Sequence, residues 1–258
     1  MLIAMAVWNT VENQRYDCTV KTIDSLLTQV DTKSHPIYIV NNASTDPRTA
    51  PLLERLSAYG RATIITNETN LGTARAINRA WKFRKPGQCC VKMDDDVVVH
   101  QKDWPDLMEE VFRRDTTIGI VGFKRNDCWE NPAHENEWFK SHLYMLPHQP
   151  NERWIVAEHV HHVIGTCQAY SSTLLDKMGY LLQFGPYGLD DSLSAVRCEV
   201  SGLKSVFIPH VPIDHVDNVQ REYTDWKKRI SEESVPKFLE TIAAYRNGTL
   251  PIYWEDKD

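Results

Sequence analysis

Three consecutive aspartates, Asp94, Asp95 and Asp96, stand between two short apolar runs near the middle of the chain. Residues 89–93 before them are typical of a buried strand, and residues 97–99 resume the apolar pattern directly behind. Like charges this close cost free energy or raise one another's pKa, and a bound cation would relieve that repulsion. Carboxylate oxygens suit Mg²⁺ and Mn²⁺, with substrate phosphates often completing the shell. A solvated turn between two strands is the alternative.

A second acidic pair, Asp190 and Asp191, follows the turn-rich residues 184–189 and opens a predicted helix that runs to about residue 200. The two carboxylates could cap that helix, because they accept its free N–H groups. A metal-assisted displacement also needs a base apart from the metal, and this pair could supply it. Both interpretations stay open from the residues alone.

The elements that must position these side chains alternate between strand-like and helix-like patterns. Strands are predicted at residues 1–8, 36–40, 62–66 and 89–93, and helices at residues 18–27, 49–59 and 73–83. This alternation implies crossover connections and a mostly parallel sheet, whose carboxyl ends normally carry the ligand site. Polar clusters at residues 41–46, 70–75 and 94–96 each follow a strand. We therefore expect them to meet at one edge of the sheet.

Two of these clusters carry groups suited to a nucleotide. Arg75 stands near the start of a predicted helix, where an arginine is unfavourable to the helix dipole unless an anion such as a diphosphate is bound. Its alternative is a solvated helix face. Asn41, Asn42 and Asp46 offer donors and acceptors for a nucleobase or ribose, or they form a capping turn before the next helix.

The chain continues with a predicted helix at residues 104–114 and a predicted strand at residues 117–123. From residue 124 to 159 the periodic pattern is lost, and a segment this long in a compact domain is usually functional or mobile. Its indoles could stack on sugar rings or bases, which would place the acceptor side there, or they form a satellite hydrophobic cluster. A strand at 165–170, a helix at 171–178 and a strand at 204–209 are predicted to follow.

Cysteine and histidine spacing disfavours a zinc or disulfide framework. None of the six cysteines forms a CxxC pair. A strand-like stretch carries His159, His161 and His162, where the first two share a face and the third does not, so a metal site there is disfavoured.

Composition bounds the class of protein. With 258 residues, 42% apolar and 25% charged, the chain is an ordinary globular protein with one large domain or a domain with an appendage. A net charge of -6 argues against sequence-independent binding of nucleic acid. The first eight residues lack a basic region and are too short for a signal peptide or a membrane span, which predicts a cytoplasmic protein.

The tail changes character from residue 219 onward. It is predicted to form two charged amphipathic helices separated by Pro236. Mixed charges disfavour membrane insertion. We expect these helices to pack back over the polar edge of the sheet or to make a homo-oligomer contact.

Together these residues resemble family-2 glycosyltransferases of the GT-A fold, over roughly residues 2–215. Residues 41–46 are similar to the family's nucleotide-contacting segment, and residues 93–96 match its DxD motif. The sequence Asn70-Leu71-Gly72, with Arg75 shortly after, resembles the Asn-x-Gly signature on the diphosphate side. Residues 165–179 resemble the acceptor-side strand and helix. The family's Glu-Asp pair falls at Asp190 and Asp191, and its final metal ligand falls at His215.

The resemblance implies an α/β fold: a single GT-A (Rossmann-like) domain with a mostly parallel central sheet flanked by helices, followed by a C-terminal helical tail. The domain would cover residues 1–218, with a nucleotide-sugar half at 1–100 and an acceptor half at 101–218. Residues 219–258 would form the helical extension.

The resemblance also implies a role for each site residue in an inverting, metal-dependent transfer from a nucleotide-diphosphate sugar, with a UDP-sugar as the first guess. Asp191 would be the catalytic base, and Asp96 and His215 would hold Mn²⁺ or Mg²⁺. The donor would be bound by Asn41, Asp46, Asn70, Gly72, Arg75, Asp94 and Asp95. The acceptor side would include Asp190, Trp129, Trp138 and Trp154.

Two departures from the family pattern and several alternatives remain. Asn41 replaces the usual Asp, which leaves the nucleobase open, and Leu193 replaces a frequent second Asp after the catalytic pair. A glycan or lipid-linked sugar is the expected acceptor, with a protein side chain or a hydroxymethylated DNA base as alternatives. Residues 94–98 also fit a haloacid-dehalogenase-like phosphatase, although three strand–helix units precede them. A catalytically inactive nucleotide-sugar-binding protein is the third possibility.

Overall fold

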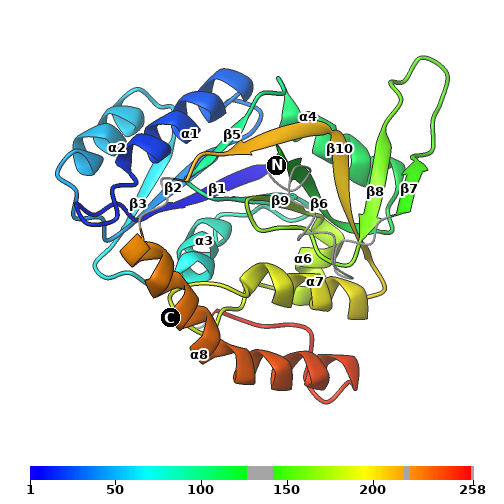
Figure 1. Ribbon diagram of the computed structural model, residues 1–258. Coiled ribbons are helices and arrows are strands. Elements are labelled where there is room, and N and C mark those ends of the chain that lie inside the picture. Colours follow the sequence, from blue (N-terminus) through cyan, green and yellow to red (C-terminus); the bar gives the residue numbers. More distant parts are fainter. Residues whose placement is uncertain (127–141, 218–220, 257–258) are drawn as a thin grey trace.

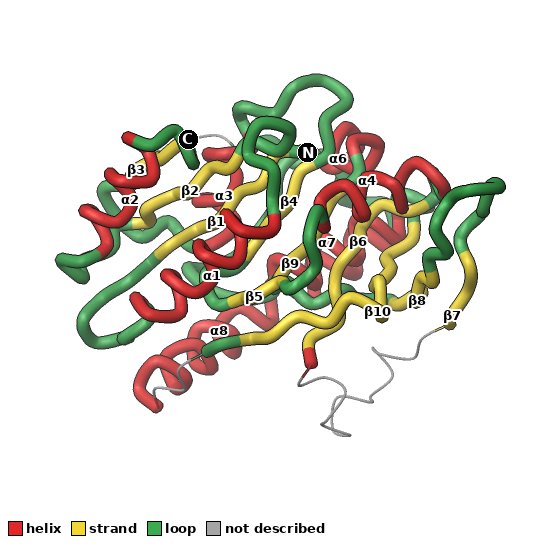
Figure 2. The backbone as a smooth tube through the Cα atoms, turned by 90° about the horizontal axis from the view of Figure 1, so that it is seen from above, coloured by secondary structure: helices red, strands yellow, loops and turns green. Residues whose placement is uncertain are grey.

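The computed structural model describes residues 1–126, 142–217 and 221–256, and in these residues one mixed sheet forms the centre of the molecule. Its main path runs β3-β2-β1-β4-β9-β6-β10-β8-β7, with β5 paired to β10. Figure 2 shows this path as one continuous twisted sheet seen from above. The predicted α/β fold is therefore confirmed.

The first half of the sheet is parallel, as the alternating pattern predicts. It contains β1 (Leu2–Val7), β2 (Ile37–Asn42), β3 (Thr63–Asn67) and β4 (Cys90–Met93). The crossover helices are α1 (Tyr16–Gln29), α2 (Thr49–Ala58) and α3 (Thr73–Trp81). In β1, Ile3 and Met5 face one apolar core while Leu2 and Ala4 face the other. Burial on both faces explains the continuous apolar run of this strand.

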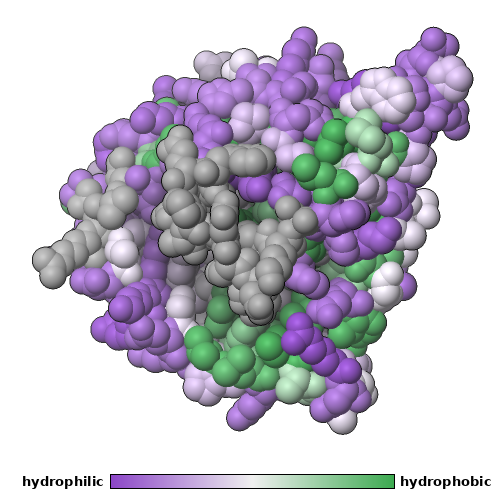
Figure 3. Space-filling model, turned by 45° about the vertical axis from the view of Figure 1, so that its right-hand side comes forward, coloured by the Kyte–Doolittle hydropathy of each residue, from purple (hydrophilic) through white to green (hydrophobic). Residues whose placement is uncertain are grey.

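Helices cover both faces of the sheet, as Figure 1 shows. The core on one face includes α1, α2 and α4 (Trp104–Arg114), and the core on the other includes α3 and α6 (Ser172–Met178). Figure 3 shows that hydrophilic side chains cover most of the viewed face, with separate hydrophobic patches among them. None of the helices in the described residues combines the length and apolar composition that a bilayer crossing requires.

The second half of the sheet is mixed. Here β9 (Cys167–Tyr170) is antiparallel to both of its neighbours, β4 and β6 (Ile118–Arg125), while β10 (Lys204–His215) runs parallel to β6. The strand β5 (Val97–Val99) pairs with the end of β10. This last strand is longer than predicted, because it continues past Pro209 and Pro212 through a register shift. Prolines are tolerated where the ladder is already interrupted.

The prediction of an irregular segment at residues 124–159 was partly wrong. Within it, β7 (His142–Met145) and β8 (Val156–Val160) form an antiparallel pair at the end of the sheet. Four- and five-residue strands carry too few side chains to give a clear period. The residues from 127 to 141 lie outside the described part of the chain.

The prediction of two tail helices was wrong, because α8 (Arg221–Arg246) is one helix with Pro236 inside it. Its second half buries Phe238, Ile242 and Tyr245 in a small core shared with Leu193 and Val196 of α7 (Asp190–Val200). Figure 1 shows α8 running beneath the sheet, across α7. The expectation that the tail packs back onto the domain is confirmed.

Candidate active site

A cleft of about 360 Å³ opens where β1 and β4 end. Asp94, Asp95 and Asp96 line it together with Asp190 and Asp191. The expectation that three polar clusters meet at one edge of the sheet is confirmed, because Asn42, Asn70 and the three aspartates all line this cleft. Asp190 and Asp191 join them from a distant part of the sequence.

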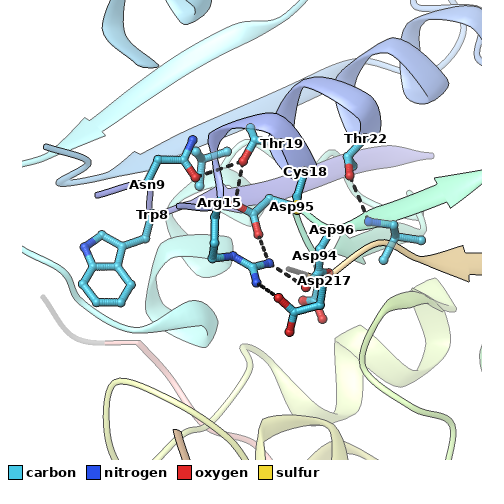
Figure 4. Close-up of polar contacts among 12 residues, drawn as sticks. Trp8, Asn9, Arg15, Cys18, Thr19, Thr22, Asp94, Asp95, Asp96 and Asp217 are labelled. Carbon is cyan, nitrogen blue, oxygen red and sulfur yellow. Dashed lines mark hydrogen bonds and ion pairs between the residues drawn. The ribbon is translucent and has the colours of Figure 1, made fainter. Parts of the chain in front are cut away.

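Arg15 holds two members of the aspartate triad, Asp95 and Asp96. Arg15 directly precedes α1, and one of its terminal nitrogens lies 2.8 Å from Asp95 Oδ1 and 2.5 Å from Asp96 Oδ2. The other donates to Asp217 Oδ1 at 2.8 Å. Figure 4 shows the guanidinium pointing into this group of carboxylates. Since Asp95 and Asp96 are only 7% and 4% exposed, the alternative of a solvated turn is wrong.

The pKa values of Asp94 and Asp96 are shifted in opposite directions. Burial raises the pKa of Asp94 to about 7, against the opposing effect of Lys92. Burial would also raise the pKa of Asp96, but His215 and Arg15 hold it below its usual range. Asp96 therefore stays ionised throughout the neutral range.

A possible metal centre lies at the end of β10. Potential ligand atoms of Asp96, His215 and Asp217 lie within 4.8 Å of one another. The pairing of β10 with β5 sets His215 opposite Val97, and its Nε2 lies 3.2 Å from Asp96 Oδ2. The other oxygen of Asp96 is buried and has no hydrogen-bond partner among the described residues. A buried carboxylate oxygen left without a partner is costly, and a divalent cation would satisfy it.

Asp191 faces the cleft from the first turn of α7. Its Oδ2 accepts from the Gly165 amide at 3.0 Å and lies 3.2 Å from His162 Nε2, while its Oδ1 accepts from the Ser192 amide at 2.7 Å. Burial would raise the pKa of Asp191, but His162 and Lys92 hold it below its ordinary range. The residue before the helix is Leu189, which makes no side-chain cap.

An aromatic wall, formed by Trp8, Tyr187, Tyr223 and Trp226, closes another side of the cleft. The Trp8 ring lies 5.4 Å from that of Trp226 and 6.2 Å from that of Tyr223, and Tyr187 lies 6.0 Å from Trp226. Lys227 adds a charge, with its Nζ 4.4 Å from the Tyr223 ring and 3.2 Å from Asp217 Oδ2. Amphipathic rings beside charged groups suit a ligand with a flat or sugar-like face.

Comparison with known proteins identifies the family. The model of glycosyl transferase family 2 matches residues 3–179, which is more than half of the chain. This chain belongs to glycosyl transferase family 2. No curated protein matches the sequence significantly.

Solved structures agree with this family 2 member in fold. The mannosyltransferase PcManGT from Pyrobaculum calidifontis, in complex with GDP-Man and Mn²⁺, has a TM-score of 0.63 and 18% identity, over 87% of this chain and 59% of that one. GalNAc-T7 with UDP, GalNAc and Mn²⁺ has a TM-score of 0.62 and 14% identity, over 85% and 43%. S. aureus TarS 1-349 with UDP-GlcNAc has a TM-score of 0.59 and 15% identity, over 85% and 61%. The chain spans less than two thirds of each of these longer proteins.

The predicted donor residues of this family 2 member are not all at the cleft. Asn70 lines it, but Asn41, Asp46 and Arg75 do not. The Asn41 side chain accepts from the Ser44 amide, and Asp46 is paired with Arg48, so both stabilise the turn between β2 and α2. The turn alternative therefore describes them better. Arg75 is exposed, which fits the solvated helix face.

Asn42, which the sequence analysis grouped with Asn41 and Asp46, does line the cleft. Its side chain donates to Asn70 Oδ1 at 2.7 Å and accepts from the Asn67 side chain at 2.8 Å. Gly72 supports this loop: its φ is 82°, and an added Cβ would lie 3.0 Å from the carbonyl oxygen of Gly185. A glycine is needed there because the left-handed backbone and the close neighbour both exclude a side chain.

The expected acceptor-side tryptophans do not gather in the described cleft. Trp129 and Trp138 lie outside the described residues. Trp154 is 66% exposed, stacks on His148 with ring centroids 3.7 Å apart, and does not line the cleft.

The prediction that His162 lies on a strand was wrong. The strand β8 ends at Val160, and the His162 ring lies against Asp191.

Several residues of the site were not identified from the sequence. These are the cleft-lining Trp8, Arg15, Lys92, Tyr187, Tyr223 and Trp226, together with Asp217, which pairs with Arg15. Trp8 carried a usable signal, because it follows the first strand directly. The residues of α8 carried none, since nothing in an amphipathic pattern tells which surface a helix will cover.

Proposed function

We propose that this glycosyltransferase is a metal-dependent, inverting enzyme that moves a sugar from a nucleotide-diphosphate donor to an acceptor hydroxyl. The observation that carries the proposal is the meeting of two carboxylate groups in one cleft. A single side chain, Lys92, lies within 3.5 Å of Asp94 and 2.9 Å of Asp190. A site for the leaving group and a site for a base are thus adjacent.

The residues present fit a divalent ion. Asp96 and His215 would hold it, with Asp217 close enough to take part, and the unpartnered Asp96 oxygen supports this assignment. Mn²⁺ suits a set that includes an imidazole, and Mg²⁺ is the alternative. A bound ion would supply charge neutralisation for the diphosphate leaving group.

Asp191 is the base in this proposal. Its carboxylate takes the proton of the acceptor hydroxyl while that oxygen forms a bond to the anomeric carbon. The bond from that carbon to the diphosphate oxygen breaks with its electron pair on the leaving nucleotide. Attack from the face opposite the leaving group inverts the configuration. The Gly165 amide and the Ser192 amide hold Asp191 in place for this step.

The donor is a nucleotide-diphosphate sugar, with its nucleoside near Trp8, Asn42 and Asn70. Complexes of similar folds with GDP-Man and UDP-GlcNAc support this class of donor, and a UDP-sugar is the first candidate. The acceptor is a glycan or lipid-linked sugar, with a protein side chain or a modified DNA base as alternatives. The phosphatase alternative has no support from the family match or the order of strands.

The test is Asp191→Asn, assayed by release of UDP or GDP from UDP-GlcNAc, UDP-glucose and GDP-mannose with Mn²⁺. Turnover is expected to fall by about 10²–10⁴-fold, the usual contribution of a general base, while donor binding is retained. Asp24→Asn, on the exposed face of α1, is the matched control and should leave turnover unchanged.

Full activity of Asp191→Asn would show that another group is the base. A wild-type protein that binds a donor but neither transfers nor hydrolyses the sugar would instead support the inactive binder.

A further inference from the structure

Lys92 is a buried cation at the floor of the cleft. It lies on β4, two residues before Asp94, and is 3% exposed. Its Nζ lies 2.9 Å from Asp190 Oδ2 and 3.5 Å from Asp94 Oδ1, and it donates to the Gly165 carbonyl at 3.1 Å. The contact with Gly165 is a hydrogen bond, and the two carboxylates pair with the ammonium through their charge.

Stability alone does not explain a lysine at this position. Its neighbours on β4, Val91 and Met93, are fully buried apolar residues. Desolvating an ammonium costs several kcal/mol, and apolar replacements of buried ion pairs are often neutral or stabilising. A charged side chain here is more simply explained by what it does to the carboxylates around it.

Gly165 connects Lys92 to the proposed base. Its carbonyl accepts from Lys92, and its amide donates to Asp191 Oδ2 at 3.0 Å. A Cβ added to Gly165 would lie 2.7 Å from Lys92 Nζ and 3.1 Å from Asp191 Oδ2. A side chain at this position would displace the Lys92 ammonium and crowd Asp191.

We propose that Lys92 is a positioning residue that couples the two halves of the active site. Its ammonium holds Asp94 on the donor side, and it holds Asp190 and the Gly165 peptide on the acceptor side, so that Asp191 is aimed at the reacting carbon. This inference rests on the proposed role of Asp191. Lys92 makes its contacts with the protein and takes no proton in the reaction.

The first test is Lys92→Met, which keeps the length of the side chain and removes its charge. We expect kcat for nucleotide release from UDP-GlcNAc or GDP-mannose to fall by about 10²-fold, as small misplacements of catalytic groups do. The KM for the donor should change by less than about threefold, because the proposed contacts to the metal and nucleoside remain. The exposed Lys21→Met on α1 is the matched control.

The pH profile supplies a readout that a purely structural role would not move. The charged groups facing Asp191 are His162, Lys92 and Asp190. Loss of the Lys92 cation disfavours the ionised carboxylate, so the acid limb of kcat should move to higher pH in Lys92→Met. Lys21→Met should keep the wild-type limb.

A second variant covers the case in which Lys92→Met does not fold. Gly165→Ala would press a methyl group between Lys92 and Asp191, and we expect the same loss in kcat with donor KM retained. Unchanged kcat and an unshifted acid limb in either folded variant would overturn the proposal. Parallel loss of kcat and donor binding would also overturn it. An active Asp191→Asn beside an impaired Lys92→Met would instead locate the error in the choice of base.

Discussion

At the scale of single residues, the cleft concentrates carboxylates and offsets them with buried cations. Arg15 forms ion pairs with Asp95, Asp96 and Asp217, and Lys92 forms ion pairs with Asp94 and Asp190. Burial alone would lower the pKa of Arg15, but Asp95 and Asp96 raise it, so the guanidinium stays charged. Two fixed cations thus allow acidic groups to remain close together before any ligand arrives.

The pairing of His162 with Asp191 should make the stability of the protein depend on pH. Burial by itself would lower its pKa, but Asp191 raises it above the ordinary value of about 6.5. A raised folded-state pKa contributes stability that is fully present below about pH 6.5 and is lost as pH rises through the folded value. In His162→Gln this contribution is absent. The Tm difference between the wild type and the variant should therefore be larger at pH 5.5 than at pH 9.

The measurement is a set of thermal melts of both proteins across that range. The exposed His161→Gln on the same loop is the matched control, and its Tm difference from the wild type should vary less with pH. A Tm difference for His162→Gln that stays constant, or grows toward pH 9, would contradict the ion pair with Asp191.

At the scale of elements, the two halves of α8 contact different parts of the molecule. Its first half carries Tyr223, Trp226 and Lys227, which line the cleft. Its second half packs on α7 through Phe238, Ile242 and Tyr245. Because α7 begins with Asp190 and Asp191, the packing of α8 supports the helix that presents the proposed base.

Two neighbouring side chains on α8 test this packing. Phe238 is 8% exposed, whereas Leu239, the next residue, is 54% exposed. Phe238→Ala should lower the free energy of unfolding by about 3–5 kcal/mol, because it leaves a cavity against α7. Leu239→Ala should change it by less than about 0.5 kcal/mol. Denaturant titration measures both, and equal effects would show that this half of α8 does not pack as described.

At the scale of the whole molecule, the cleft lies where the parallel half of the sheet meets its mixed half. β4 is parallel to β1 and antiparallel to β9, and the Asp triad follows it directly. β10 returns from the mixed half to bring His215 beside Asp96. The site therefore joins distant parts of the fold, and ligand binding should be linked to global stability.

That linkage gives a prediction for the donor and the metal. A donor at about 100 times its Kd stabilises the folded protein by about 2.7 kcal/mol, which raises the Tm. We expect UDP-sugars or GDP-mannose to raise the Tm more with Mn²⁺ than without it. Asp96→Ala should abolish the Mn²⁺-dependent part. The control is Asp106→Ala, which should retain it; Asp106 belongs to a second group in the described residues, with His35 and Glu109, whose ligand atoms lie within 4.8 Å of one another. A Tm increase in Asp96→Ala equal to that of the wild type would place the ion elsewhere.

The sequence by itself determined the order of elements and the acidic motifs. Alternating apolar patterns predicted the four parallel strands and the helices between them, because period and punctuation are local properties. The same patterns placed Asp94–Asp96 after a strand and Asp190–Asp191 at a helix start. The family resemblance then assigned roles that now stand as proposals.

Only the tertiary structure decided which side chains share the cleft. Arg15 and Lys92 meet their carboxylates across sequence separations of 80 and 98 residues, which no local pattern encodes. Trp8 and Trp226 also come together from distant parts of the sequence. Asp46 and Arg75 follow strands as the cleft residues do, yet they do not line the cleft. Strand pairing and helix packing set these contacts, and their register depends on the whole buried core rather than on the residues that do the chemistry.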